Sequence, residues 1–298
     1  MLWNPFAGWG EPPEAIIANG TKVWTTFHGG AAFSRPLQDV FGGEEAAEAA
    51  RLHVEHCHAR WQAALPTLRG VIVPSEYGAQ EFLSLFDFPR ARIQIIPHGV
   101  NHKLFNILGE AIPDVGFLHV SAGGPVKNIP RILQAYDSLP TRFRPPLTLV
   151  IPAERFTPRM DQVAGVRLIS GPVSPIELAT LYRGATALIH PSLWESFGMT
   201  IVEAMACGCP VLAGDNSAMR EYYSGAALLV DPRSQSAIAD GMIDLLNEDC
   251  RHDFQQRGCQ QANQFSWEKA AEAHAQAFFP LGAWREALRE VGTGSGGD

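Results

Sequence analysis

The stretch His190–Ala204 decides the fold of this chain, and it reads HPSLWESFGMTIVEA. Before it, the apolar run Ala185–Ile189 predicts a buried parallel strand that ends at a histidine-proline pair. After a turn of small residues, Met199–Ala206 consists of helix-forming residues, and Gly208 indicates where that helix ends. The order of strand, tight turn and helix predicts one α/β unit of a larger parallel sheet.

The turn at the start of this helix predicts an anion-binding site. Backbone amides at the start of a helix have no partners within the helix, and together with the helix dipole they favour the binding of a phosphate. In this turn they are the amides of Phe197, Gly198 and Met199. Glu203 lies about one helical turn further on, where its carboxylate can accept hydrogen bonds from sugar hydroxyls. Glu195 lies in the turn, nearer to the group attached to the phosphate. The alternative is that both glutamates only cap or solvate an ordinary helix start.

The second half of the chain alternates regularly between strand-like and helical stretches. The expected strands are Gly116–Ser121, Leu147–Ile151, Val166–Ser170, Ala185–Ile189, Pro210–Ala213 and Ala226–Val230. The expected helices between them include Ile129–Leu139, Pro175–Arg183 and Gln235–Leu246. This alternation predicts a doubly wound parallel sheet, whose ligands bind outside the carboxyl ends of the strands, where Glu195 lies.

The first half carries fewer signals. The expected strands are Lys22–Phe27, Gly70–Pro74 and Arg92–Ile96, and the expected helices are Glu44–Leu65 and Ser75–Phe86. The segment Pro97–Asn101 breaks the third strand and is expected to lead to the second domain. A sheet of three strands would expose an apolar edge and face, so we expect another chain or a second copy to cover it.

Composition limits the class of protein. The chain has 298 residues, 46% of them hydrophobic, which is enough for two domains with large cores. Its net charge of -8 argues against a nucleic-acid partner, whose phosphates require a basic face. The first residues lack the pattern of a secretory leader, and no uncharged apolar run has the length of a membrane span, so a cytoplasmic protein is expected.

The cysteines and histidines of the chain predict neither a disulfide nor a metal site. The chain has five cysteines, and we interpret the close pair Cys207 and Cys209 as small buried hydrophobic side chains. Residues 53–58 include three histidines and one cysteine, but on a helix these would not converge on one point. We therefore expect a solvated helix face there and no metal site.

The stretch His190–Ala204 resembles the signature of retaining nucleotide-sugar glycosyltransferases of the GT-B fold, family 4, also called glycosyl transferases group 1. The resemblance implies that the donor diphosphate is held by the amides of Phe197, Gly198, Met199 and Thr200. It also implies that Glu203 binds the ribose and that Glu195 contacts the donor sugar. Retention in this family resembles a front-face reaction in which the leaving phosphate takes the acceptor proton. A role for Glu195 as a covalent nucleophile is the less favoured alternative.

Other positions extend the resemblance. Lys127-Asn128 resembles the family's lysine that meets the donor diphosphate, where a positive charge assists the leaving group without a metal. Gly171 to Val173 resembles the segment that cradles the base through backbone contacts, so UDP, GDP and ADP sugars all stay open. His28 ends a strand where the family has a histidine that faces the donor sugar from the acceptor domain. A histidine with an ordinary role at a strand end is the alternative.

The chain also departs from the family pattern. The arginine that usually stands five residues before the lysine is Ala122 here, so either another residue such as Arg131 replaces it or turnover is poor. Gly29 follows His28 where the family usually has aspartate. Because the chain reaches His28 almost at once, the opening strands of the first domain are expected to be missing, either natively or because the gene is split.

The resemblance implies an α/β chain with a GT-B-like organisation. Residues 1–107 would form a truncated α/β acceptor-side domain, and 108–265 a doubly wound, Rossmann-type domain that binds the nucleotide sugar. Residues 266–291 would return to the first domain as a helix, and 292–298 would be disordered. The implied function is a retaining, metal-independent hexosyltransferase with an unknown acceptor and no cofactor. The alternative is a nucleotide-sugar-binding or scaffold subunit without turnover, completed by a partner chain or a second copy; membrane contact stays open.

Overall fold

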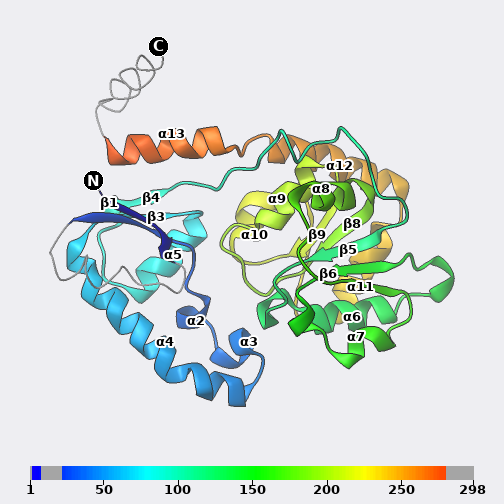
Figure 1. The fold of residues 1–298 in the computed structure, drawn as a ribbon, viewed down its shortest axis with the longest axis horizontal. Coiled ribbons are helices and arrows are strands. Elements are labelled where there is room, and N and C mark those ends of the chain that lie inside the picture. The colour runs from blue at the N-terminus through cyan, green and yellow to red at the C-terminus, as the bar shows by residue number, and fades with distance from the viewer. Residues whose placement is uncertain (1, 8–21, 280–298) are drawn as a thin grey trace, which may run out of the picture.

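Figure 1 shows the computed structural model, which describes residues 2–7 and 22–279. Two lobes lie side by side, and each is built on its own parallel sheet, one of four strands and one of six. The predicted tail at 292–298 and the end of the predicted final helix lie outside the described residues.

The first sheet has one strand more than the sequence indicated. Its strands are, in spatial order, β1 (Leu2–Ala7), β2 (Val23–Phe27), β3 (Leu68–Val73) and β4 (Ile93–Ile95). The expectation of three strands is therefore wrong, because β1 pairs in parallel with β2, with Leu2 opposite Val23. This pairing makes β2 an inner strand, and all five of its residues are buried, as an inner parallel strand requires.

Two helices, α4 (Glu44–Ala64) and α5 (Glu76–Leu85), cover one face of the first sheet. The short helices α2 (Ala31–Ser34) and α3 (Leu37–Phe41) lie between β2 and α4 in the chain, and α3 packs on α4. The ring of Phe27 in β2 packs edge-on against Trp61 of α4 and Phe82 of α5, with centroid distances of 5.6 and 5.1 Å. These large buried rings hold the helices on the sheet and so fix the loop that follows β2.

The second sheet is doubly wound, as expected. Its strands are β5 (Gly116–Val120), β6 (Leu147–Val150), β7 (Val166–Ile169), β8 (Ala185–His190), β9 (Val211–Gly214) and β10 (Leu228–Val230). They are parallel in the order β10-β9-β8-β5-β6-β7, so the winding reverses between β5 and β8. Ligands of open α/β sheets bind at such a reversal, outside the carboxyl ends of the strands.

Helices cover both faces of the second sheet. They are α6 (Ile129–Asp137), α7 (Pro158–Gln162), α8 (Pro175–Gly184), α9 (Met199–Ala206), α10 (Ser217–Tyr223), α11 (Gln235–Asp244) and α12 (Glu248–Ala262). One buried cluster contains Ile201 and Met205 of α9, and another contains Ile132 of α6 and Ile238 of α11. Burial on both sides explains why the strands read as continuous apolar runs.

The last described helix, α13 (Trp267–Phe278), lies beside the first sheet (Figure 1). Ser266 forms a parallel bridge with Val100 just before this helix begins. Ala270 of α13 then packs with Trp24 and Ile72 of the first sheet in a small buried cluster. The chain thus crosses between the lobes twice. None of the helices in the described ranges combines the length and apolarity needed to cross a membrane.

Candidate active site

Two oppositely charged side chains meet at the carboxyl edge of the second sheet. Because β5 and β8 are parallel neighbours, the segments that follow them lie together, and these carry Lys127 and Glu195. Lys127 Nζ lies 2.5 Å from Glu195 Oε1, and His190 Nε2 lies 2.8 Å from the same oxygen. Glu195 is only 8% exposed. Sequence reasoning expected both residues near the donor, but it did not predict that they pair.

The surroundings of Glu195 keep its side chain ionised. Burial by itself raises the pKa of this carboxyl, but the charge of Lys127 and the hydrogen bond with His190 outweigh burial and hold the pKa well below its usual range. The ion pair is therefore close to neutral as a unit. Removal of either partner would leave a charge with little access to water, which is costly.

Two stacked histidines support this pair, and sequence reasoning missed them. The rings of His119 and His190 are 5.8 Å apart and nearly parallel. His119 Nδ1 lies 2.8 Å from the Ile189 carbonyl oxygen, and its Nε2 lies 2.8 Å from Ser121 Oγ. Burial, with a smaller effect of His190, lowers the pKa of His119 to about 3, so this ring is neutral. The available signal was a histidine in the middle of the otherwise apolar strand β5.

The turn before α9 has the geometry of a helix start that is open to a ligand. Gly198 has a left-handed backbone with φ +85°, and a Cβ there would lie 2.9 Å from Met219 Cε, so glycine is required. In the described part of the chain, no hydrogen bond is given by the amides of Met199 and Thr200. These two amides begin the helix and remain available to an acceptor such as a phosphate oxygen.

The side chain of Phe197 has a packing role. Its ring is buried and contacts the rings of His98, Tyr222 and Phe265 with centroid distances of 5.4, 5.3 and 5.2 Å. The Tyr223 hydroxyl donates to the Phe197 carbonyl oxygen at 2.9 Å. The predicted contact of Phe197 with a donor is therefore left to its amide, while the ring anchors the turn against the segments that join the lobes.

Glu203 is a partly buried carboxyl on α9. Burial raises its pKa to about 7, and the only protein hydrogen bond described for it is a long one, 3.5 Å, from the Tyr182 hydroxyl. Among the described residues, no cation forms an ion pair with it. A carboxyl of this kind has unused acceptor capacity for a polar ligand.

A cavity of about 510 Å³ opens over the ends of β5, β6 and β7. Val173 lines it together with Gly171, and Ala153 and Glu154 line it from the turn after β6. Val173, to which the resemblance assigns the base, thus lines this cavity, and its contact with a base stays a prediction. A cavity lined mainly by apolar residues suits a flat ring.

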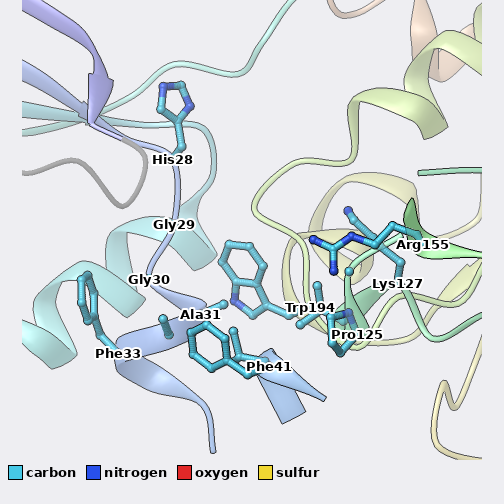
Figure 2. Close-up of a pocket in the computed structure, with 14 residues that line it drawn as sticks. His28, Gly29, Gly30, Ala31, Phe33, Phe41, Pro125, Lys127, Arg155 and Trp194 are labelled. Carbon is cyan, nitrogen blue, oxygen red and sulfur yellow. The ribbon is translucent and has the colours of Figure 1, made fainter. Parts of the chain in front are cut away.

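A second cavity, of about 500 Å³, lies between the two lobes (Figure 2). Its first-lobe wall includes His28, Phe33 and Phe41, and its second-lobe wall includes Lys127 and Arg155. His28 follows β2 and stacks on His98, with 5.4 Å between the ring centroids. His28 and Lys127 thus line the same cleft from opposite lobes, and the role of His28 toward a donor sugar stays a prediction.

Asn128 and Arg131 both contribute to the framework below this cleft. The Asn128 side-chain amide donates to the carbonyl oxygens of Pro191 and Pro232, at 2.9 and 2.7 Å. Its oxygen accepts from the Arg131 guanidinium at 2.5 Å. These contacts tie three loops together at the carboxyl edge of the sheet. A direct contact of Asn128 with a donor stays a prediction, and Arg131 is already held by Asn128 rather than directed at the cleft.

A buried carboxylate, Glu81, joins the lobes beside the cleft, and sequence reasoning missed it as well. It accepts from the Gly30 amide at 2.9 Å, from Ser34 Oγ at 2.6 Å, and across the lobes from Trp194 Nε1 at 2.9 Å. The Trp194 ring lies against Gly29, where a Cβ would be 2.0 Å from the ring. Glycine at position 29, which departs from the family pattern, thus makes room for this tryptophan.

Two family models and several known proteins match this chain. The model for glycosyl transferases group 1 matches residues 103–261, and the model for glycosyltransferase family 4 matches residues 2–104. The O-antigen chain mannosyltransferase B of Escherichia coli is 27% identical over 277 residues, which is 86% of this chain and 70% of that protein. The D-inositol 3-phosphate glycosyltransferase of Acidothermus cellulolyticus is 35% identical over 132 residues, 43% of this chain and 28% of that protein.

Solved structures share the fold. A sucrose-phosphate synthase from Thermosynechococcus elongatus superposes with a TM-score of 0.68 at 24% identity, covering 90% of this chain and 68% of that one. The structure of Anabaena HepE in complex with UDP and glucose also superposes with a TM-score of 0.68, at 15% identity. This match covers 89% of this chain and 75% of that one. The chain therefore belongs to the glycosyl transferases group 1 family, and its two Rossmann-like lobes form the GT-B fold.

Proposed function

We propose that this chain is a retaining glycosyltransferase that moves a sugar from a nucleoside-diphosphate donor to an acceptor in the cleft between the lobes. The observation that carries the proposal is the position of Lys127 and Glu195 at the point where the winding of the second sheet reverses. The open amides of Met199 and Thr200 begin the helix that follows the Glu195 turn. Two cavities lie at this same edge, and we assign one to the base and the other to the acceptor.

The donor would be bound by three kinds of contact. We assign the ribose hydroxyls to the Glu203 carboxylate, the phosphate oxygens to the Met199 and Thr200 amides and Lys127, and the base to the cavity at Val173. The donor sugar would then lie toward Glu195 and the cleft. This placement leaves His28 on the opposite wall, where it faces the sugar and the acceptor.

The transfer step needs stabilisation of a departing anion. The bond between the anomeric carbon and the phosphate oxygen breaks, and its electron pair leaves with the diphosphate. The acceptor hydroxyl oxygen bonds to the anomeric carbon on the same face, and its proton passes to the departing phosphate oxygen. Lys127 and the helix amides stabilise the charge that develops, so we propose that no metal is required. We assign Glu195 to the sugar and disfavour it as a nucleophile, because two donors already engage one of its oxygens.

Calorimetry with UDP, GDP and ADP tests the donor site, and incubation with the matching nucleotide sugars then tests transfer and hydrolysis in the presence of EDTA. We expect Glu203→Ala to abolish nucleotide binding and Glu195→Ala to retain binding while transfer slows. Glu55→Ala, on the exposed face of α4, is the matched control and should change neither. Nucleotide affinity that is unchanged in Glu203→Ala would contradict the assignment. Binding without any transfer or hydrolysis would favour a nucleotide-sugar-binding subunit.

A further inference from the structure

Two segments of the second lobe cross from the base cavity to the cleft. After β6, Ala153 and Glu154 line the base cavity, and the next residue, Arg155, lines the cleft. After β5, Ser121 lines the base cavity, and Lys127 lines the cleft. A ligand with its base in one cavity and its sugar in the other must pass its linking group over these two segments. Arg155 and Lys127 lie at this crossing.

The position of Arg155 is defined by packing of its stem. Gly123 has φ +71°, and a Cβ there would lie 2.7 Å from both Cβ and Cγ of Arg155, so the arginine stem lies directly over this glycine. Figure 2 shows Arg155 and Lys127 on the second-lobe wall of the cavity. The side chain is thus directed along the wall of the cleft.

Arg155 also differs from the other two cations near this edge in the contacts that its side chain makes. Lys127 is paired with Glu195, and Arg131 is held by Asn128. Among the described residues, no carboxylate forms an ion pair with Arg155. A nucleoside diphosphate carries negative charge on both phosphates and gains more when the glycosidic bond breaks. Lys127, whose charge is partly offset by Glu195, would balance only part of that negative charge.

We infer that Arg155 binds the donor diphosphate and supplies the second positive charge for its departure. A planar guanidinium can donate two parallel hydrogen bonds to phosphate oxygens, which a lysine cannot. This role rests on the proposed function, because it requires a nucleoside diphosphate in the two cavities. It also explains how a chain with alanine at position 122 can hold two cations against the diphosphate.

The test compares nucleoside diphosphate and monophosphate affinities by calorimetry, with UDP, GDP and ADP and the corresponding UMP, GMP and AMP. We expect Arg155→Ala to weaken binding of the preferred diphosphate by about tenfold or more and binding of its monophosphate by about twofold at most. Arg159→Ala, an exposed arginine on α7, is the matched control and should leave both affinities unchanged. Because Ala122 is exposed, the double variant Arg155→Ala, Ala122→Arg has room for the new side chain and should recover much of the loss.

The outcomes separate this inference from the proposed function. If the wild-type chain binds a nucleoside diphosphate and Arg155→Ala binds it equally well, the role of Arg155 is overturned while the donor site stands. An equal loss for diphosphate and monophosphate would also overturn it, because that loss would not reflect the second phosphate. If the wild-type chain binds none of the three diphosphates, the proposed donor site and the role of Arg155 fail together.

Discussion

Replacement of Glu203 by glutamine should make the protein more stable in alkaline solution. Burial raises the pKa of this carboxyl from its ordinary 4.5 to about 7, so the folded protein keeps a proton there that the unfolded chain releases. The contribution of this side chain to the free energy of unfolding is therefore fully present below pH 4.5, and it is lost as the pH rises through 7. At 1.36 kcal/mol per pKa unit, the shift corresponds to about 3 kcal/mol of unfolding free energy at pH 8.5.

Glutamine has almost the same shape, is neutral at every pH and can still accept from the Tyr182 hydroxyl. We expect Glu203→Gln to match the wild type at pH 4 and to exceed its unfolding free energy by up to about 3 kcal/mol at pH 8.5. Urea unfolding followed by circular dichroism measures this difference. Glu55→Gln, an exposed change on α4, should show no such dependence on pH.

The same carboxyl links stability to donor binding. Ribose hydroxyls donate to the ionised form, so wild-type nucleotide affinity should fall as the pH is lowered below about 7, and Glu203→Gln should bind weakly at every pH. A substitution that raises stability and weakens ligand binding is typical of a functional residue whose charge is partly buried in the folded protein. A Glu203→Gln variant that is less stable than the wild type at pH 8.5, or a difference that is the same at pH 4 and 8.5, would refute the reasoning.

Three further changes test the contacts around the cleft. Lys127→Met should lower the unfolding free energy, measured by urea unfolding, by about 3 kcal/mol, because Glu195 then keeps a buried charge without its partner. The double variant Lys127→Met, Glu195→Gln should recover most of this loss. If the effects of the two substitutions simply add, the coupling is disproved. Gly29→Asp should be strongly destabilised, because its Cβ would overlap the Trp194 ring, and Trp194→Ala in the same chain should relieve part of the loss in a thermal melt; an unchanged melting temperature for the single variant would contradict this. Glu81→Gln should slow transfer, measured in rate assays, more than it weakens nucleotide binding, measured by calorimetry, because Glu81 joins the lobes on the acceptor side. Equal losses in transfer rate and in nucleotide affinity would count against that role.

Most elements of the second lobe followed directly from the sequence, because strands buried on both faces are continuous apolar runs and the helices between them carry clear start and stop signals. The helix Met199–Ala206 agrees with its expected bounds. The strand Leu2–Ala7 was not predicted, and its sequence gives a weak strand signal because it contains Pro5, and proline argues against a strand. An edge strand tolerates proline, and the register of β1 against β2 shifts between Asn4 and Ala7, on either side of it.

The α/β class, the alternation of strands and helices, and the turn that places Glu195 and Gly198 at a helix start can all be read from the order of the residues. The pairing of Lys127 with Glu195, 68 positions away, and the contact of Trp194 with Glu81, 113 positions away, appear only in the folded molecule. Local patterns encode the period of an element and the chemistry of its turns. Contacts between distant side chains depend on which strands become neighbours and how closely the two lobes approach, and those are properties of the packed molecule.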